Sequence, residues 1–286
     1  MTADKPSSRL PWEGVPDSLQ QGALYVVSTP IGNMADFTPR GAWALAHVDR
    51  IAAEDTRHTA LLLARHGIQT SMVPYHEHNA QRMLPRLIAD LESGKTIALV
   101  SDAGTPGVSD PGYRLITEAA ERGLTIVPIP GASALLAALV AAGLPMDRFA
   151  FEGFLPRKKG RQTRLGELAQ ESRTVVIYES PLRTGKTLAD LAGALGGARR
   201  AAVCRELTKT FEEILRGTLS GLAEKYSTTP PKGEIVIVVE GLTRRKRQGE
   251  EISPGGEPPD GSHHATGGGG LAFPAITTRG KQGRRK

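Results

Sequence analysis

Cysteine is almost absent from this 286-residue chain, and Cys204 is its only one. A single cysteine excludes an internal disulfide and a cluster of metal-bound thiolates, and we expect Cys204 to be a small buried hydrophobic residue. No stretch approaches the eighteen consecutive apolar residues that a membrane-spanning helix needs. The first residues, MTADKPSSRLPWEG, lack the apolar core of a signal peptide, so we expect a cytoplasmic protein.

Two common phosphate-binding motifs are missing as well. STPIGN (residues 28–33) stands where a dinucleotide-binding G-x-G-x-x-G would follow the first expected strand, and no G-x-x-x-x-G-K-[ST] occurs. His76 and His78 of YHEHN are spaced unlike a helical H-E-x-x-H zinc site. Two histidines on one face of an extended segment remain able to ligate, but we expect no metal. These absences disfavour a standard Rossmann enzyme and an NTPase.

Short β-rich runs alternate with helical runs in the first half of the chain. We expect strands at residues 23–27, 51–53, 72–74, 97–100 and 125–128. Helices are expected near residues 39–46, 56–65, 79–93, 113–122 and 132–142. This alternation predicts a mostly parallel sheet with helices on both faces.

The second half has a different pattern. The helix over residues 132–142 ends at Gly143 and Pro145, a stop signal that we take as a domain boundary. Beyond it, strands are expected at residues 149–152, 175–178, 201–206, 212–216 and 235–240, with helices only near 163–169 and 188–195. We therefore expect an α/β protein with a mixed sheet in its second domain. The expected divisions are an N-terminal extension (1–21), two α/β domains (22–145 and 146–243) and a tail (244–286).

The last 43 residues are basic and rich in glycine. They hold nine Lys and Arg against four acidic residues, so they carry +5 of the formal net charge of +6. Few of them are large and apolar, and we expect a disordered tail that attracts polyanions such as RNA without sequence preference. Incidental composition explains the charge equally well. His263 and His264 fit a solvated linker better than a metal site.

One loop carries the densest functional pattern. Residues 101–112, SDAGTPGVSDPG, join an apolar strand to a helical pattern and contain three glycines, two prolines and two aspartates. Glycine lets the backbone approach a ligand closely, proline stiffens the loop, and free N–H groups and carboxylates suit a small polar molecule. An ordinary turn needs only two to six residues, so we interpret this loop as a cofactor-binding loop.

Taken together, the loops resemble a known family. The chain is similar to the tetrapyrrole methylase-like (class III) S-adenosylmethionine-dependent methyltransferases, and most closely to their small-subunit (16S) ribosomal RNA cytidine 2′-O-methyltransferases. Class-level features alone leave corrin methylases and diphthine synthase open, whereas EDTRHT and RELTKTFEE favour the rRNA branch. The matching segments, which span about three quarters of the chain, are LYVVSTPIGN (24–33), AAEDTRHT (52–59), YHEHN (75–79), LVSDAGTPGVSDPG (99–112), PGASA (130–134), FEGFLPRK (151–158), VIYESPLR (176–183), CRELTKTFEE (204–213) and KGEIVIVVEG (232–241).

The resemblance implies two α/β domains with S-adenosylmethionine in the cleft between them, in a class that commonly forms homodimers. It implies an enzyme that methylates the ribose 2′-hydroxyl of a cytidine in the decoding region of small-subunit rRNA. A tetrapyrrole or protein substrate, or a non-catalytic RNA-binding ribosome-assembly factor, remains the alternative. The implied cofactor-binding residues are Pro30, Asp102, Ala103, Gly104, Val108, Ser133, Tyr178 and Leu207.

Candidate catalytic residues follow two expected strands, where open α/β sheets place ligands. Glu54 or His76 is a candidate to accept the hydroxyl proton, and Arg57 to clamp a phosphate. Helix capping by Asp55 and a surface pair of Glu54 with Arg57 is the alternative. Glu206 and Lys209 are further candidates for the cleft. The alternative for these two residues is a plain ion pair at the end of a strand.

A basic patch follows two phenylalanines in the second half. Arg157, Lys158 and Arg161 suit phosphate-backbone contacts with RNA, although a solvated helix start explains them about as well. The sequence also departs from the family at Leu182, where histidine is frequent, so we expect no proton transfer there. Many members carry a C-terminal helical extension where this chain has its Gly-rich tail.

Overall fold

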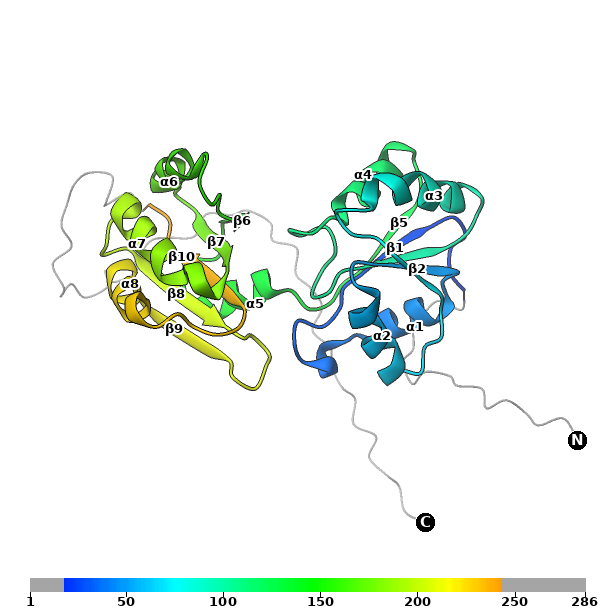
Figure 1. Ribbon diagram of the computed structural model, residues 1–286, viewed down its shortest axis with the longest axis horizontal. Coiled ribbons are helices and arrows are strands. Elements are labelled where there is room, and N and C mark those ends of the chain that lie inside the picture. Colours follow the sequence, from blue (N-terminus) through cyan, green and yellow to red (C-terminus); the bar gives the residue numbers. More distant parts are fainter. Residues whose placement is uncertain (1–17, 243–286) are drawn as a thin grey trace, which may run out of the picture.

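The computed structural model of the protein describes residues 18–242. They form two lobes, each built on a five-stranded sheet (Figure 1). Most of the expected N-terminal extension and the whole basic tail, with its two histidines, lie outside the described residues. Within residues 18–242, no helix combines the length and the apolar character needed to cross a membrane.

The first lobe holds an all-parallel sheet in the order β3-β2-β4-β1-β5. Its strands are β1 (Leu24–Val27), β2 (Arg50–Ala53), β3 (Met72–Pro74), β4 (Ile97–Val100) and β5 (Ile126–Ile129). Its helices are α1 (Pro39–His47), α2 (Thr56–Arg65), α3 (Ala80–Glu92) and α4 (Tyr113–Glu121). All nine elements were predicted from the sequence to within a few residues at their ends.

Helices cover both faces of this sheet, as predicted. α1 and α2 bury Trp43 and Leu62 against one face, which includes Val27 of β1. α3 and α4 bury Leu87 and Leu115 against the opposite face. Both faces of the strands are therefore apolar, which explains why β1 and β4 are continuous hydrophobic runs in the sequence.

The second lobe holds a mixed sheet, also as predicted. The order is β6-β7-β10-β8-β9, in which only β6 and β7 pair in parallel. The strands are β6 (Phe149–Phe154), β7 (Thr174–Glu179), β8 (Arg200–Arg205), β9 (Glu213–Thr218) and β10 (Ile235–Val239). The covering helices are α6 (Arg161–Ala169), α7 (Thr184–Leu195) and α8 (Leu219–Thr228), and a short 3-10 turn, η2 (Pro181–Arg183), precedes α7.

Helix α8 contradicts the prediction of only two helices in this half. The Thr218 hydroxyl caps it by accepting a hydrogen bond from the Gly221 N–H at 3.2 Å. Leu219, Leu222 and Tyr226 are buried at a spacing of three and four residues, which is the helical pattern. The signal was thus present in the sequence, but the turn residues around it masked it.

Helix α5 (Ala134–Ala142) links the two lobes. It begins at Ser133, whose side chain caps the helix, and ends at Gly143 in a left-handed conformation (φ 67°). Its buried residues Ala138 and Leu139 pack against Val176 and the rest of the second sheet (Figure 1). The sequence grouped α5 with the first domain, whereas its packing places it with the second.

Candidate active site between the lobes

The loop at residues 101–112 is fixed in place by its own hydrogen bonds. Thr29 exchanges two backbone hydrogen bonds with Gly104, at 2.9 and 3.1 Å. The Asp110 carboxylate accepts from the N–H groups of Gly107 and Gly112, at 2.7 and 2.8 Å. Gly104 has a φ of +80°, which other residues rarely adopt. The loop is therefore a rigid wall, and it borders three cavities.

The first cavity lies between the lobes and has a volume of about 370 Å³. We call it the inter-lobe cavity. Both lobes contribute its mostly apolar wall, and the polar groups are few. It is lined by Ile31, Ala103, Gly104, Thr105, Val108, Ser133, Ala134, Phe154, Tyr178, Glu179, Ser180, Pro181, Gly233, Glu234, Ile235 and Val236.

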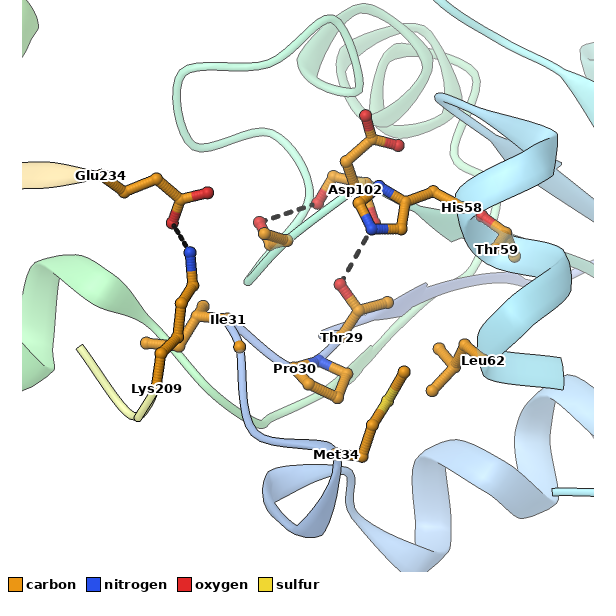
Figure 2. Close-up of a pocket in the computed structure, with 13 residues that line it drawn as sticks. Thr29, Pro30, Ile31, Met34, His58, Thr59, Leu62, Asp102, Lys209 and Glu234 are labelled. Carbon is orange, nitrogen blue, oxygen red and sulfur yellow. Dashed lines mark hydrogen bonds and ion pairs between the residues drawn. The ribbon is translucent and has the colours of Figure 1, made fainter. Parts of the chain in front are cut away.

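A smaller neighbouring cavity, the Pro30 cavity, has a volume of about 160 Å³. It shares Ile31, Ala103 and Glu234 with the inter-lobe cavity. Figure 2 shows it between two elements of different lobes, with Lys209 and Glu234 at one side and α2 at the other. Its remaining lining residues are Thr29, Pro30, Gly32, Met34, His58, Thr59, Leu62, Ser101, Asp102 and Lys209.

The third cavity, the Glu54 cavity, has a volume of about 550 Å³ and a polar wall. It lies on the other side of the loop and is lined by Glu54, His76, Glu77, His78, Gly107, Ser109, Asp110, Pro111, Tyr113 and Arg114. Two of the residues that the sequence proposed as proton acceptors, at the ends of different strands, therefore face one space.

Glu54 and His76 have unusual surroundings in this cavity. Burial raises the pKa of the Glu54 carboxyl, and the negative charges of Asp102, Asp110 and Asp55 raise it further. Glu54 Oε2 accepts a hydrogen bond from the Asp102 N–H at 3.2 Å. The buried Nδ1 of His76 has no hydrogen-bond partner among the described residues. Glu54 and His76 therefore place two polar side chains on the wall of one cavity.

Comparison with known proteins identifies the fold and the family. The sequence pattern of the tetrapyrrole (corrin/porphyrin) methylases matches residues 23–223, which include every wall of the Glu54 cavity. The chain belongs to the tetrapyrrole methylase family. The resemblance seen in the loops is therefore confirmed, as is the predicted pair of α/β sheets.

Relatives place the chain within one branch of the tetrapyrrole methylases. It is 54% identical over 227 residues to the ribosomal RNA small subunit methyltransferase I of Mesorhizobium japonicum, covering 79% of this chain and 77% of that protein. It belongs to that branch as well.

Solved structures of tetrapyrrole methylases share the fold. A cobalt precorrin-4 methyltransferase aligns with a TM-score of 0.58 at 18% identity, over 77% of this chain and 95% of that one. A uroporphyrin-III C-methyltransferase from Thermus thermophilus, complexed with S-adenosylhomocysteine, aligns with a TM-score of 0.53 at 17% identity, over 76% and 96% of the two chains.

The structure brings most of the expected cofactor residues of this methylase together. Ala103, Gly104, Val108, Ser133 and Tyr178 line the inter-lobe cavity, and Pro30, Asp102 and Ala103 line the Pro30 cavity. The Ser133 hydroxyl also caps α5 by accepting a hydrogen bond from the Leu136 N–H at 3.4 Å.

Leu207 lies apart from the other expected cofactor residues. It lines none of the three cavities and is buried in the apolar cluster beneath α5. The same cluster includes Ile31 and Val236, which line the inter-lobe cavity, so Leu207 lies behind a wall of that cavity.

Arg57 and Asp55 form the helix-capping arrangement that the sequence left open. Asp55 caps α2, and its carboxylate pairs with the Arg57 guanidinium at 2.7 Å. This pairing holds the pKa of Asp55 well below its usual range. The expected pair of Glu54 with Arg57 does not form, because Glu54 turns toward Asp102. The Arg57 side chain is 90% exposed and lies outside the three cavities.

Arg161 does not belong to the exposed basic patch, so this part of the RNA prediction is wrong. Its guanidinium is buried and donates hydrogen bonds to Asp190, the Pro156 carbonyl and Thr187 at 2.8, 3.1 and 2.9 Å. These partners leave the group no access to a phosphate. Arg157 and Lys158, by contrast, are exposed.

Glu234 is the residue at the cleft that the sequence did not suggest. Lys209 Nζ pairs with the carboxylate of Glu206 at 2.9 Å and with that of Glu234 at 3.2 Å, and Figure 2 shows the contact with Glu234. The expected ion pair of Glu206 with Lys209 is therefore present, but Glu234 extends it into the Pro30 cavity. The Lys209 stem also fills the space above Gly32, where a Cβ would lie 2.3 Å from its Cγ. The three charged residues belong to the second lobe, and the approach of Lys209 to Gly32 brings them against the first.

Proposed function

We propose that this chain transfers a methyl group from S-adenosylmethionine to the ribose 2′-hydroxyl of a cytidine in the decoding region of small-subunit rRNA. The name of the relatives supports the rRNA substrate. The observation that carries the proposal is the placement of the loop at residues 101–112 between two cavities. One of them is apolar and shared by the lobes, and the other is polar and holds two candidate proton acceptors.

The inter-lobe cavity fits the cofactor. Its volume of about 370 Å³ is that of a small-molecule pocket, and its wall combines apolar side chains with a few polar groups. A Cβ at Gly104 would lie 3.4 Å from the Ile31 side chain, so this glycine keeps the backbone accessible. When bound, S-adenosylmethionine supplies a methyl group on a positively charged sulfur. Val108 and Tyr178 would pack its apolar parts, and the Asp102 carboxylate at the adjoining Pro30 cavity would offset positive charge.

The Glu54 cavity would receive the acceptor nucleotide. Glu54 Oε1 or a ring nitrogen of His76 would accept the proton of the ribose hydroxyl, since both residues face this space. Most of the acceleration is expected from in-line alignment of the ribose oxygen, the methyl carbon and the sulfur. The two ligands would have to meet at residues 107–109 of the loop, where Val108 lines one cavity and Gly107 and Ser109 line the other. Arg57 would clamp a phosphate of the RNA, exchanging its contact with Asp55 for that phosphate.

Exposed basic residues would hold the RNA backbone. Arg157 and Lys158 lie in the loop before α6, at the same end of β6 that borders the inter-lobe cavity. Phosphate contacts of this kind position RNA without selecting a sequence.

Three further expectations belong to this proposal. The lobes act as two domains, with the division placed before α5 because that helix packs on the second sheet. The family resemblance supports a homodimer and a cytoplasmic location, where ribosomal subunits are assembled. Light scattering of the purified protein and localisation in the cell test these two expectations.

Methylation of defined substrates tests the function. The protein is incubated with methyl-labelled S-adenosylmethionine and with assembled small subunits, naked rRNA or a tetrapyrrole, and any ribose methyl is mapped. A label on a cytidine ribose is the expected result. A label only on the tetrapyrrole contradicts the proposal. Absence of a thermal shift with S-adenosylmethionine contradicts it too, because a specific ligand at a hundred times its Kd stabilises the folded state by about 2.7 kcal/mol.

A further inference from the structure

A β-bulge redirects the end of β6. Phe151 pairs with Val176 and Phe154 pairs with Tyr178, and the register shifts between Phe151 and Gly153. Phenylalanines three residues apart in a regular strand point to opposite faces of the sheet. Because one extra residue is inserted, both face the same side here, together with Tyr178.

Gly153 makes this bulge possible. Its φ is +58°, and a Cβ there would lie 2.9 Å from the Ser109 hydroxyl of the loop at residues 101–112. The bulge therefore brings the end of β6 against the loop that separates the two substrate cavities. Among residues 18–242, β6 is an edge strand and no further strand covers this end of the sheet.

Phe154 is left exposed by this arrangement. Its side chain is 58% exposed, although the phenylalanine ring makes an edge-to-face contact with Tyr178 at 5.8 Å between centroids. It lines the inter-lobe cavity and also a separate cavity of about 450 Å³ beside α6. Phe151, by contrast, is partly buried under the same tyrosine. The bulge thus presents one aromatic ring at the junction of two open spaces.

The charges near Phe154 favour a polyanion. Arg157, Lys158 and Lys159 follow it within five residues and are all exposed. Arg164, in the wall of the cavity beside α6, adds no free positive charge, because its guanidinium pairs with Glu152 and Glu167 of the same wall. The positive charge beside Phe154 therefore comes from the three exposed residues. An exposed ring next to phosphate-binding side chains is the combination by which proteins hold single-stranded RNA, since every base has a face that stacks.

We propose that Phe154 is a stacking platform for an unpaired base of the RNA that neighbours the acceptor nucleotide. Arg157 and Lys158 contact the phosphates of the same strand. This inference rests on the proposed function, because it assumes an RNA substrate. It assigns a binding subsite outside the Glu54 cavity and names the ligand as an unpaired nucleotide.

Four variants test the platform on the full-length protein: Phe154→Ala, Phe154→Leu, Phe154→Trp and Phe211→Ala. Phe211 is the matched control, because it is a phenylalanine of the same lobe that is 70% exposed and lines none of the four cavities. The measurements are kcat and KM for assembled small subunits, the affinity for S-adenosylmethionine, and the midpoint of thermal unfolding.

Loss of stacking should raise the KM for small subunits about tenfold or more in Phe154→Ala. Phe154→Leu should behave similarly because it keeps apolar volume but no π-face, whereas Phe154→Trp should restore the wild-type value. The unfolding midpoint should stay within error of the wild type in all four variants. Because Phe154 also lines the inter-lobe cavity, the KM for small subunits in Phe154→Ala should rise by a larger factor than the Kd for S-adenosylmethionine.

Two results overturn the platform. In one, Phe154→Ala has the same KM as Phe211→Ala. In the other, Phe154→Ala loses affinity for S-adenosylmethionine and keeps its KM for RNA, which would assign the ring to the cofactor. Failure of the wild-type protein to methylate any RNA is a separate result, which refutes the proposed function instead.

Discussion

The two lobes border the cleft with different parts of their sheets. The first lobe contributes loops at the carboxyl ends of parallel strands, including those that carry Glu54 and Asp102. The second lobe contributes one face and one edge of a mixed sheet, including Tyr178 of β7 and Phe154 of β6. The polar, titratable groups thus come mainly from the first lobe, and the aromatic ones from the second.

This difference assigns proton transfer to the first lobe and binding of the RNA to the second. Loops at strand ends hold short polar side chains in fixed positions, which suits proton transfer. A sheet face and an edge strand present broad apolar surface, which suits packing and stacking. Substitutions in the first lobe should therefore lower kcat, and exposed substitutions in the second should raise the KM for RNA.

The largest effect is expected for Glu54→Gln. Removal of the proton acceptor should lower kcat about a hundred- to thousandfold with little change in affinity for S-adenosylmethionine. Single-turnover methylation of small subunits measures this. Glu118→Gln, on the surface of α4, is the control and should keep wild-type activity. A loss below tenfold in Glu54→Gln would transfer the role to His76.

Arg161→Ala should destabilise the second lobe without changing the residues that line the cleft. Its guanidinium is buried with Asp190, and removal of one partner of such a pair should lower the free energy of unfolding by about 3 kcal/mol. Urea unfolding measures the change. The exposed neighbour Arg157→Ala should change it by less than about 0.5 kcal/mol. Equal, small changes in the free energy of unfolding of both variants would mean that Arg161 is exposed and belongs to the RNA-contacting patch.

Gly104→Ala tests whether the rigid loop contributes to binding of S-adenosylmethionine. The left-handed φ of this residue should cost about 1 kcal/mol of stability. The added Cβ would make an ordinary contact with Ile31 and narrow the inter-lobe cavity that both residues line, so affinity for S-adenosylmethionine should fall severalfold. Calorimetric titration measures the affinity. Gly94→Ala is the control, because it has a φ of +91° and open space around it. The same loss of affinity in both variants would mean that the loss comes from lower stability of the fold and not from the loop.

The pH at which kcat falls on acidification should be higher than expected for a general base with the pKa of an ordinary glutamate. The pKa of Glu54 is raised above its usual 4.5, mainly by burial, so activity should begin to fall on acidification at a higher pH. The raised pKa also means that protonation favours the folded state, and stability from this group is lost as pH rises through it. The acid limb should therefore precede acid unfolding and should be absent from Glu54→Gln.

The smallest effect is expected for the pair Arg157→Ala and Lys158→Ala. Loss of two phosphate contacts should raise the KM for small subunits severalfold and should lower the slope of log affinity against log salt by about 2. Phe154→Ala should leave this slope unchanged, because stacking involves no counterion release. A changed slope in Phe154→Ala would mean that Phe154 and the two basic residues bind the RNA as one electrostatic surface.

Much of the first lobe could be predicted from the sequence, because its strands are short apolar runs and two of its helices, α1 and α2, have side-chain caps. Asp55 and Thr38 mark helix starts through hydrogen bonds to the next turn. The second lobe was predicted less fully. The residues of α8 follow β9 without a strong break, and α5 is so apolar that its partner sheet cannot be inferred from its own pattern.

By itself, the sequence determined the order of elements in the first lobe, the family and the position of the rigid loop, because these depend on local patterns of glycine, proline and apolar residues. Only the tertiary structure decided which side chains face the cleft. It buried Arg161 against Asp190, extended the Lys209 pair to Glu234, and turned Phe154 outward through a bulge. The physical reason is that exposure and ion pairing depend on contacts between residues far apart in the chain.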